Sequence, residues 1–174
     1  MKEVAEVLRG LSGRRVLVLC HRSADPDGLA SAVVLSEVLS SLGARASAGA
    51  ADDISLPARQ VVEHFGRRVE VDPRMDFDAV VLVDTSGFGH LGSMGEEVRR
   101  FAGLKIVIDH HRPNEETRRE VDFHFVFENY PSESELVFDM VGEMGLSLTP
   151  DQASMLLAGI ITDTAHFRLA RPET

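Results

Sequence analysis

Apolar runs that end in acids or imidazoles recur along the chain. Residues 15–20 (RVLVLC), 78–86 (DAVVLVDTS) and 104–111 (LKIVIDHH) contain aliphatic stretches, and near-continuous apolar runs are typical of strands buried on both faces. Apolar positions recur at helical spacing over 27–43, and a shorter helix is predicted over 93–103. The pattern therefore predicts strands separated by helices.

The later part of the chain predicts an edge strand and two helices. Residues 122–129 (DFHFVFEN) alternate phenylalanine with other residues, as in a half-exposed strand. One helix begins at Ser132, with Glu135 in capping-box spacing, and the next begins at Thr149, with Pro150 at its first position. The predicted fold class is α/β, with a mostly parallel sheet and helices on both faces. Ligands of such sheets bind at the carboxyl ends of the strands.

Composition narrows the class of protein. The chain has 174 residues, of which 44% are hydrophobic and 26% charged, which predicts one domain. It shows no apolar segment of membrane-spanning length and no signal peptide, so we expect a cytoplasmic protein without a membrane partner. The formal net charge of −10 argues against a broad basic surface for duplex nucleic acid. The single cysteine, Cys20, excludes a disulfide framework and is interpreted as a small buried residue.

Acids and imidazoles at the predicted strand ends should meet at one edge of the sheet. They follow three different apolar runs and the last helix: His21, Asp25, Asp27, Asp84, Asp109, His110, His111 and Asp163. Without thiols, this set suits Mn²⁺ or Mg²⁺ better than Zn²⁺. A pair of cations would relieve the repulsion between the carboxylates and would favour hydrolysis of a phosphate ester or anhydride. For Asp25 and Asp27 alone, capping of the following helix is an equally good explanation.

Four segments, in order, resemble the motifs of the DHH phosphoesterase superfamily. They are residues 21–31 (HRSADPDGLAS), 81–86 (VLVDTS), 109–114 (DHHRPN) and 159–168 (GIITDTAHFR), and together they span most of the chain. The resemblance implies two metal sites that share Asp84 as a bridging carboxylate. One metal would be held by His21, Asp25 and Asp84, and the second by Asp27, Asp84, His110 and Asp163.

The resemblance also implies catalytic roles. A water held between two divalent ions would be the nucleophile. His111 is expected to face the phosphate, and Asp109 is expected to orient an imidazole by accepting its N–H. Asn114 and Arg168 match positions near the site in relatives, and Arg112 and His166 could touch a phosphate, but none of these four is counted as catalytic.

Two departures from the superfamily pattern stand out. Ala165 replaces a glycine that is frequent in the fourth motif, which should tighten the space beside Asp163 without removing metal binding. Residues 1–174 are expected to be the catalytic DHH domain alone, with the usual carboxyl-terminal substrate-binding domain absent from this chain. Weak activity is therefore expected, either because the chain is a fragment or because another chain supplies that domain.

The motifs also suggest a substrate class. The first motif resembles RecJ-type exonucleases, and the fourth resembles enzymes that degrade oligoribonucleotides and dephosphorylate 3′-phosphoadenosine 5′-phosphate. We expect a metal-dependent phosphoesterase whose partner is a nucleotide or a short oligonucleotide, in a chain that could form a homodimer. The alternatives are a manganese-dependent inorganic pyrophosphatase and a non-catalytic nucleotide-binding or regulatory module.

Overall fold

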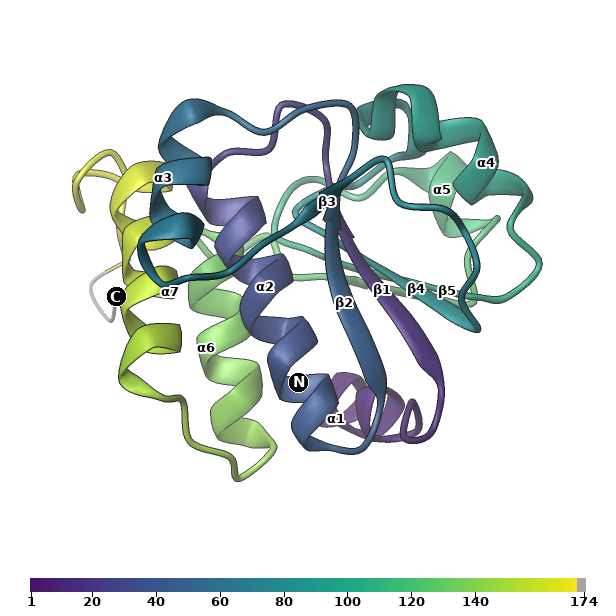
Figure 1. Ribbon diagram of the computed structural model, residues 1–174, viewed down its shortest axis with the longest axis horizontal. Coiled ribbons are helices and arrows are strands. Elements are labelled where there is room, and N and C mark those ends of the chain that lie inside the picture. Colours follow the sequence, from purple (N-terminus) through teal and green to yellow (C-terminus); the bar gives the residue numbers. More distant parts are fainter. Residues whose placement is uncertain (172–174) are drawn as a thin grey trace.

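A single parallel sheet forms the centre of the molecule. The computed structural model describes residues 1–171. Six strands pair in the order β3-β2-β1-β4-β5-β6, and every pairing is parallel (Figure 1). The strands are β1 (Arg15–Cys20), β2 (Arg45–Ala50), β3 (Glu70–Val71), β4 (Ala79–Val83), β5 (Leu104–Asp109) and β6 (Phe123–Val126). The chain leaves β1 toward one edge and β4 toward the other, and sheets of this kind bind ligands at that switch point.

Helices cover both faces of the sheet. One face carries α1 (Lys2–Arg9), α2 (Pro26–Ser41), α3 (Leu56–His64), α6 (Glu133–Glu143) and α7 (Pro150–Asp163). The other carries the 3₁₀ helix η1 (Phe88–Met94), α4 (Gly95–Arg100) and α5 (Glu115–Arg118). A hydrophobic core lies on each face of the sheet, and alternate residues of β1 pack into each. Val16 and Val18 face the α2 side, while Leu17 and Leu19 face the η1 side. The predicted α/β class is confirmed.

Several local predictions are also confirmed. Strand β6 lies at an edge of the sheet, and its four residues are half-buried. The side chains of Ser132 and Thr149 cap α6 and α7 by accepting hydrogen bonds from backbone N–H groups three residues later. Cys20 is buried, and burial raises the pKa of its thiol, so it is unsuited to nucleophilic catalysis. In residues 1–171 we find no helix with both the length and the hydropathy needed to cross a bilayer.

The sequence did not predict the elements between residues 44 and 77. Strand β2 (RASAGA) lacks large apolar residues, and a Cβ atom at Gly49 would lie 2.8 Å from Pro73 Cγ and 3.0 Å from Leu17 Cδ1. Small residues therefore let neighbouring segments approach this strand. Strand β4 covers the apolar part of residues 78–86 and ends before Asp84, whose φ of 55° departs from the extended conformation.

Candidate metal centre

The loop after β1 supplies two of the predicted ligands. His21 Nε2 lies 3.9 Å from Asp25 Oδ1, and that same carboxylate oxygen accepts a hydrogen bond from Gly28 N at 3.0 Å. Asp25 is thus the N-cap of α2 and also a neighbour of His21. Capping and a place in the site, which the sequence left as alternatives, occur together.

Asp27 joins two helices at the floor of the site. Its side chain is 1% exposed, and its two oxygens accept hydrogen bonds from Glu133 N at 2.7 Å and Ser134 N at 2.9 Å. A carboxylate at the N-terminus of α6 is favoured by the exposed N–H groups of the first helical turn. Asp27 therefore fixes α6 against α2 while keeping an oxygen near His110 and Asp163.

Asp84 lies between two imidazoles at the end of β4. Its Oδ2 is 3.3 Å from His21 Nε2, and its Oδ1 is 3.2 Å from His110 Nε2. The residue is 6% exposed and holds a left-handed backbone conformation, which is uncommon for a residue other than glycine and recurs at functional sites. Gly28 permits this packing, because a Cβ atom there would lie 2.8 Å from Asp84 Oδ2.

The two imidazoles of the Asp-His-His triplet at the end of β5 have different hydrogen-bond partners. Asp109 is fully buried, and its Oδ1 lies 2.9 Å from His110 N and 2.8 Å from His111 Nδ1. His110 Nδ1 lies 3.2 Å from the backbone oxygen of Tyr130, so its Nε2 is turned toward Asp84. Asp109 therefore contacts the imidazole of His111, while the Tyr130 carbonyl orients that of His110.

Among residues 1–171, the predicted residues come together in three groups whose donor atoms lie within 4.8 Å of one another. The groups are His21, Asp25 and Asp84; Asp27, His110 and Asp163; and Asp84, Asp109, His110 and His111. The first group contains the residues predicted for one metal, and the second contains those predicted for the other metal except Asp84, whose Oδ1 lies 3.2 Å from His110 Nε2. All eight residues therefore meet at one edge of the sheet, and their roles stay predictions.

The charges of the imidazoles reflect the surrounding acids. Burial lowers the pKa of His21, but the carboxylates of Asp25 and Asp84 outweigh burial and raise the pKa to about 11. Burial likewise lowers the pKa of His110, and Asp84 outweighs it, so the pKa is about 9. Hydrogen bonding to Asp109 raises the pKa of His111. The site thus draws positive charge onto its imidazoles.

Burial has the opposite consequence for several acids. It raises the pKa of Asp27 to about 7, with the charge of Asp84 adding to the effect. Burial also raises the pKa of Asp163, and raises that of Glu133 well above its usual value. Of the described residues, Asp109 and Glu133 have buried carboxylate oxygens without a hydrogen-bond partner. A cluster of oxygen and imidazole donors without thiols fits divalent cations such as Mn²⁺ or Mg²⁺.

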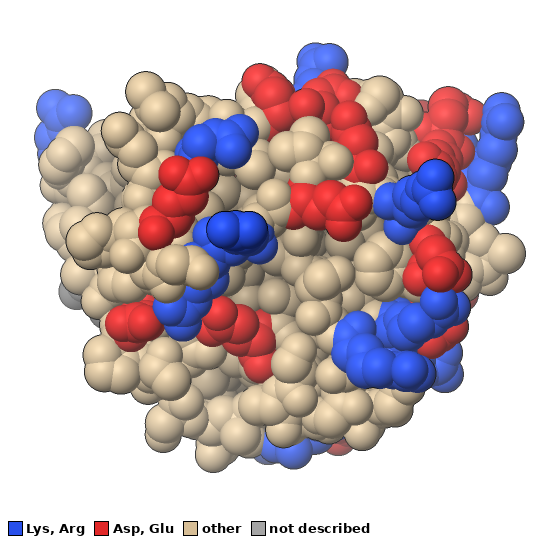
Figure 2. Space-filling view, viewed as in Figure 1, with Lys and Arg blue, Asp and Glu red and all other residues tan. Residues whose placement is uncertain are grey.

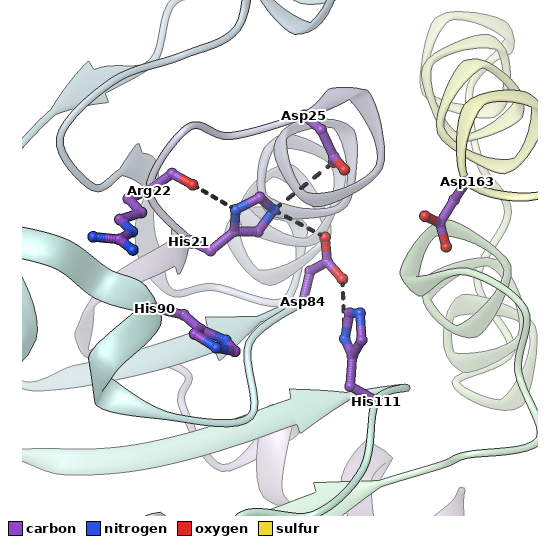
Figure 3. Close-up of a pocket in the computed structure, with 7 residues that line it drawn as sticks. All are labelled: His21, Arg22, Asp25, Asp84, His90, His111 and Asp163. Carbon is purple, nitrogen blue, oxygen red and sulfur yellow. Dashed lines mark hydrogen bonds and ion pairs between the residues drawn. The ribbon is translucent and has the colours of Figure 1, made fainter.

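A cavity of about 280 Å³ opens over this site (Figure 3). The residues that line it are His21, Arg22, Asp25, Asp84, His90, His111 and Asp163. The sequence does not predict a place in the site for Arg22 or His90, because neither matches a ligand position in the motifs. Only their positions in the sequence could have pointed to them, because Arg22 follows His21 directly and His90 lies six residues beyond Asp84.

The four motif residues not counted as catalytic are not among the residues that line the cavity. Asn114 caps α5 by accepting hydrogen bonds from Glu116 N and Thr117 N, both at 3.0 Å. Arg168 Nε donates to Ala165 O at 3.0 Å. The side chains of Arg112 and His166 are exposed. The structure therefore gives Asn114 and Arg168 local structural contacts.

Ala165 has a left-handed backbone conformation. It begins three consecutive residues, Ala165, His166 and Phe167, with φ values of 50°, 61° and 62°. This left-handed conformation costs roughly 1–2 kcal/mol for each residue that carries a Cβ atom. The glycine frequent in this motif would avoid that cost at the first position.

We expect Ala165→Gly to raise the free energy of unfolding by about 1 kcal/mol, because glycine adopts positive φ without a steric cost. Urea unfolding would measure the change. Ala158→Gly is the matched control, since Ala158 lies inside α7, where glycine should lower stability by about 1 kcal/mol. Equal destabilisation by both substitutions would contradict the explanation.

Comparisons with known proteins identify the family of the chain. The family model described as "DHH family, N-terminal domain" matches residues 15–160. An uncharacterised protein of Methanocaldococcus jannaschii is 31% identical over 97% of this chain and 51% of its own length. A probable manganese-dependent inorganic pyrophosphatase of Exiguobacterium sp. is 28% identical over 88% of this chain and 49% of the relative. The bifunctional oligoribonuclease and PAP phosphatase NrnA of Thermus thermophilus is 29% identical over 98% of this chain and 49% of its own length.

Solved structures share the fold. A putative family II inorganic pyrophosphatase of Methanococcus jannaschii is 26% identical, with a TM-score of 0.69 over 91% of this chain and 50% of that chain. An exopolyphosphatase-related protein from Bacteroides fragilis is 20% identical, with a TM-score of 0.82 over 98% of this chain and 52% of that chain. The chain spans about half the length of the curated relatives that it matches.

Proposed function

The chain belongs to the DHH family, and we propose that it is a phosphoesterase that uses two divalent cations to hydrolyse phosphodiester or phosphomonoester bonds in short oligonucleotides or nucleotide phosphates. The observation that carries the proposal is Asp84, whose two carboxylate oxygens face different imidazoles at 3.3 and 3.2 Å. The residues that would hold one cation are His21, Asp25 and Asp84, and those that would hold the other are Asp27, Asp84, His110 and Asp163.

The residues of the site suit hydrolysis at phosphorus. Bound divalent cations, Mn²⁺ or Mg²⁺, would lower the pKa of a water molecule and neutralise charge on the phosphate. In the overall reaction a water oxygen bonds to phosphorus, a P–O bond breaks and the leaving oxygen takes up a proton. His111 lines the cavity, and its Nδ1 lies 2.8 Å from Asp109 Oδ1. Its Nε2 would therefore be the ring nitrogen that contacts the substrate. The raised pKa of His111 favours the form that can give a proton to the leaving oxygen.

Charge and size support a small substrate. The net charge is −10, and the face seen in Figure 2 intersperses acidic and basic side chains without a continuous basic surface. Binding of a long polynucleotide depends on many cationic contacts with phosphates. The cavity of about 280 Å³ is at the small end for ligand pockets. The relative named as an oligoribonuclease and PAP phosphatase fits this class.

A second candidate is hydrolysis of inorganic pyrophosphate. It is favoured by the names of two relatives, a probable manganese-dependent inorganic pyrophosphatase and a putative family II inorganic pyrophosphatase. The same acids and imidazoles would serve an anhydride, because both reactions displace an oxygen at phosphorus. The two candidates differ in what must be accommodated beyond the reacting phosphate.

The test is turnover of three substrates by the purified chain with Mn²⁺, with EDTA as the control. We expect cleavage of a dinucleotide or of 3′-phosphoadenosine 5′-phosphate, and loss of cleavage when EDTA is added. Cleavage of pyrophosphate alone would replace the proposed substrate with the second candidate. Failure to cleave any of the three, in protein shown to hold Mn²⁺, would favour a binding or regulatory module.

A further inference from the structure

Arg22 and His90 line the cavity but belong to none of the three groups of candidate ligands. Figure 3 shows the His90 ring projecting from its loop toward Asp84 and His111, and the Arg22 side chain on the His90 side of the site with its guanidinium directed away from Asp84. Both side chains are exposed. The cavity therefore has an acidic side and a side that carries hydrogen-bond donors.

The backbone on both sides of His90 is fixed. His90 N donates to Gly87 O at 3.0 Å, and His90 O accepts a hydrogen bond from Arg22 N at 2.8 Å. Its neighbours in η1, Phe88 and Leu91, are 4% and 0% exposed and pack in the core. Two loops from β1 and β4 are thus joined through the two residues that face the cavity, and an exposed imidazole is presented from a rigid segment.

A phosphate group needs donors on this side of the cavity. Three carboxylates, those of Asp25, Asp84 and Asp163, line the opposite side and would repel an anion unless cations neutralised them. An imidazole offers an N–H donor in its neutral and its charged form, and a guanidinium offers several donors at fixed geometry. Donors bound to charged oxygens form stronger hydrogen bonds than neutral pairs do.

We propose that His90 and Arg22 bind the non-bridging oxygens of the substrate phosphate on the side of the cavity opposite the acids. This inference rests on the proposed function, because it concerns the same substrate. The cavity of about 280 Å³ lies close to the lower end of the roughly 300–1,000 Å³ of typical ligand pockets. The substrate class is therefore a molecule that presents a terminal phosphate or a chain end, with the remainder lying outside.

The test is calorimetric titration of inorganic phosphate into the full chain, loaded with Mn²⁺ and freed of excess metal. We expect His90→Ala and Arg22→Gln each to raise the Kd for phosphate by about 10-fold or more, as expected for loss of a hydrogen bond to a charged group. The Mn²⁺ content should equal that of the parent, because neither residue belongs to a ligand group. His64→Ala is the matched control, since His64 is an exposed histidine on α3 outside the cavity lining.

Kinetics give a second measurement. With a substrate that the parent cleaves, His90→Ala should raise KM about 10-fold, and His90→Asn, which keeps an N–H donor, should recover part of the loss. Unchanged phosphate affinity in His90→Ala, or no phosphate binding by the parent, would overturn this inference and leave the parent's hydrolysis standing. Weaker phosphate binding in His90→Ala, with no phosphoester cleaved by the parent, would support the inference and contradict the proposed function.

Discussion

Asp84→Asn should remove most of the bound Mn²⁺ and lower turnover by more than about 100-fold. Loss of a residue that only orients a metal ligand typically costs 10–100-fold, and Asp84 contacts both halves of the site. Asparagine keeps the shape and the tolerance for positive φ, but it removes the negative charge. The effect should therefore come from the site and not from unfolding.

Metal analysis after dialysis and turnover of the substrate cleaved by the parent would measure both effects. Asp76→Asn is the control, because Asp76 is 82% exposed and pairs with Arg15 on the surface, where ion pairs contribute little to stability. Parent-like Mn²⁺ content in Asp84→Asn would contradict a bridging role for this carboxylate. Matching circular dichroism spectra of the two variants would exclude a difference in folding.

The fold could be predicted wherever burial dictates the sequence. Strands β1, β4 and β5 lie between helices on both faces, so their residues are nearly all aliphatic and easily recognised. Strand β2 is built from small residues and shows no apolar run, and at Gly49 a Cβ atom would lie too close to Pro73 and Leu17. Hydrophobic periodicity fails where close approach of another segment decides the residue type.

The members of the site could be predicted for a related reason. A parallel sheet brings the residues after β1, β4 and β5 to one edge, so acids and imidazoles at those positions must meet. Which atom contacts which could not be predicted. The anchoring of Asp27 by Glu133 N and Ser134 N depends on where α6 begins in space, 106 residues further along the chain.

His90 shows the limit of motif reasoning. It belongs to no strand end and matches no ligand position, and only the turn of η1 brings it to the cavity. The hydrogen bond between Arg22 N and His90 O joins segments 68 residues apart in the sequence. Contacts of this kind follow from tertiary packing, which local pattern does not encode.

Without metal, the free energy of unfolding should fall as the pH rises from about 6 to about 8.5. Several groups have folded-state pKa values above their ordinary ones, among them Asp27 at about 7 against 3.8, His110 at about 9 against 6.5, and His21 at about 11 against 6.5. The folded state therefore binds more protons than the unfolded state over this interval. A raised pKa contributes stability below the unfolded value, and that stability is lost as the pH rises through the folded value.

Bound Mn²⁺ should oppose this dependence. Cations bind deprotonated carboxylates and neutral imidazoles, so each proton that a cation displaces makes the apparent affinity rise about tenfold per pH unit. Stabilisation by a ligand grows with the ratio of its concentration to its Kd. The difference in Tm between Mn²⁺-loaded and EDTA-treated protein should thus widen as the pH rises from about 6 to about 8.5.

Thermal unfolding followed by circular dichroism at several pH values, with and without Mn²⁺, would measure this difference. In Asp84→Asn, the difference should be small at every pH, because His21 and His110 lose the carboxylate that raises their pKa values and the cations lose a shared ligand. If the difference in Tm stays constant or narrows with rising pH, the metal does not displace protons from the imidazoles. In that case the acids would bind the cations without His21 and His110. The contacts of Asp84 with these two imidazoles would then have a role other than metal binding.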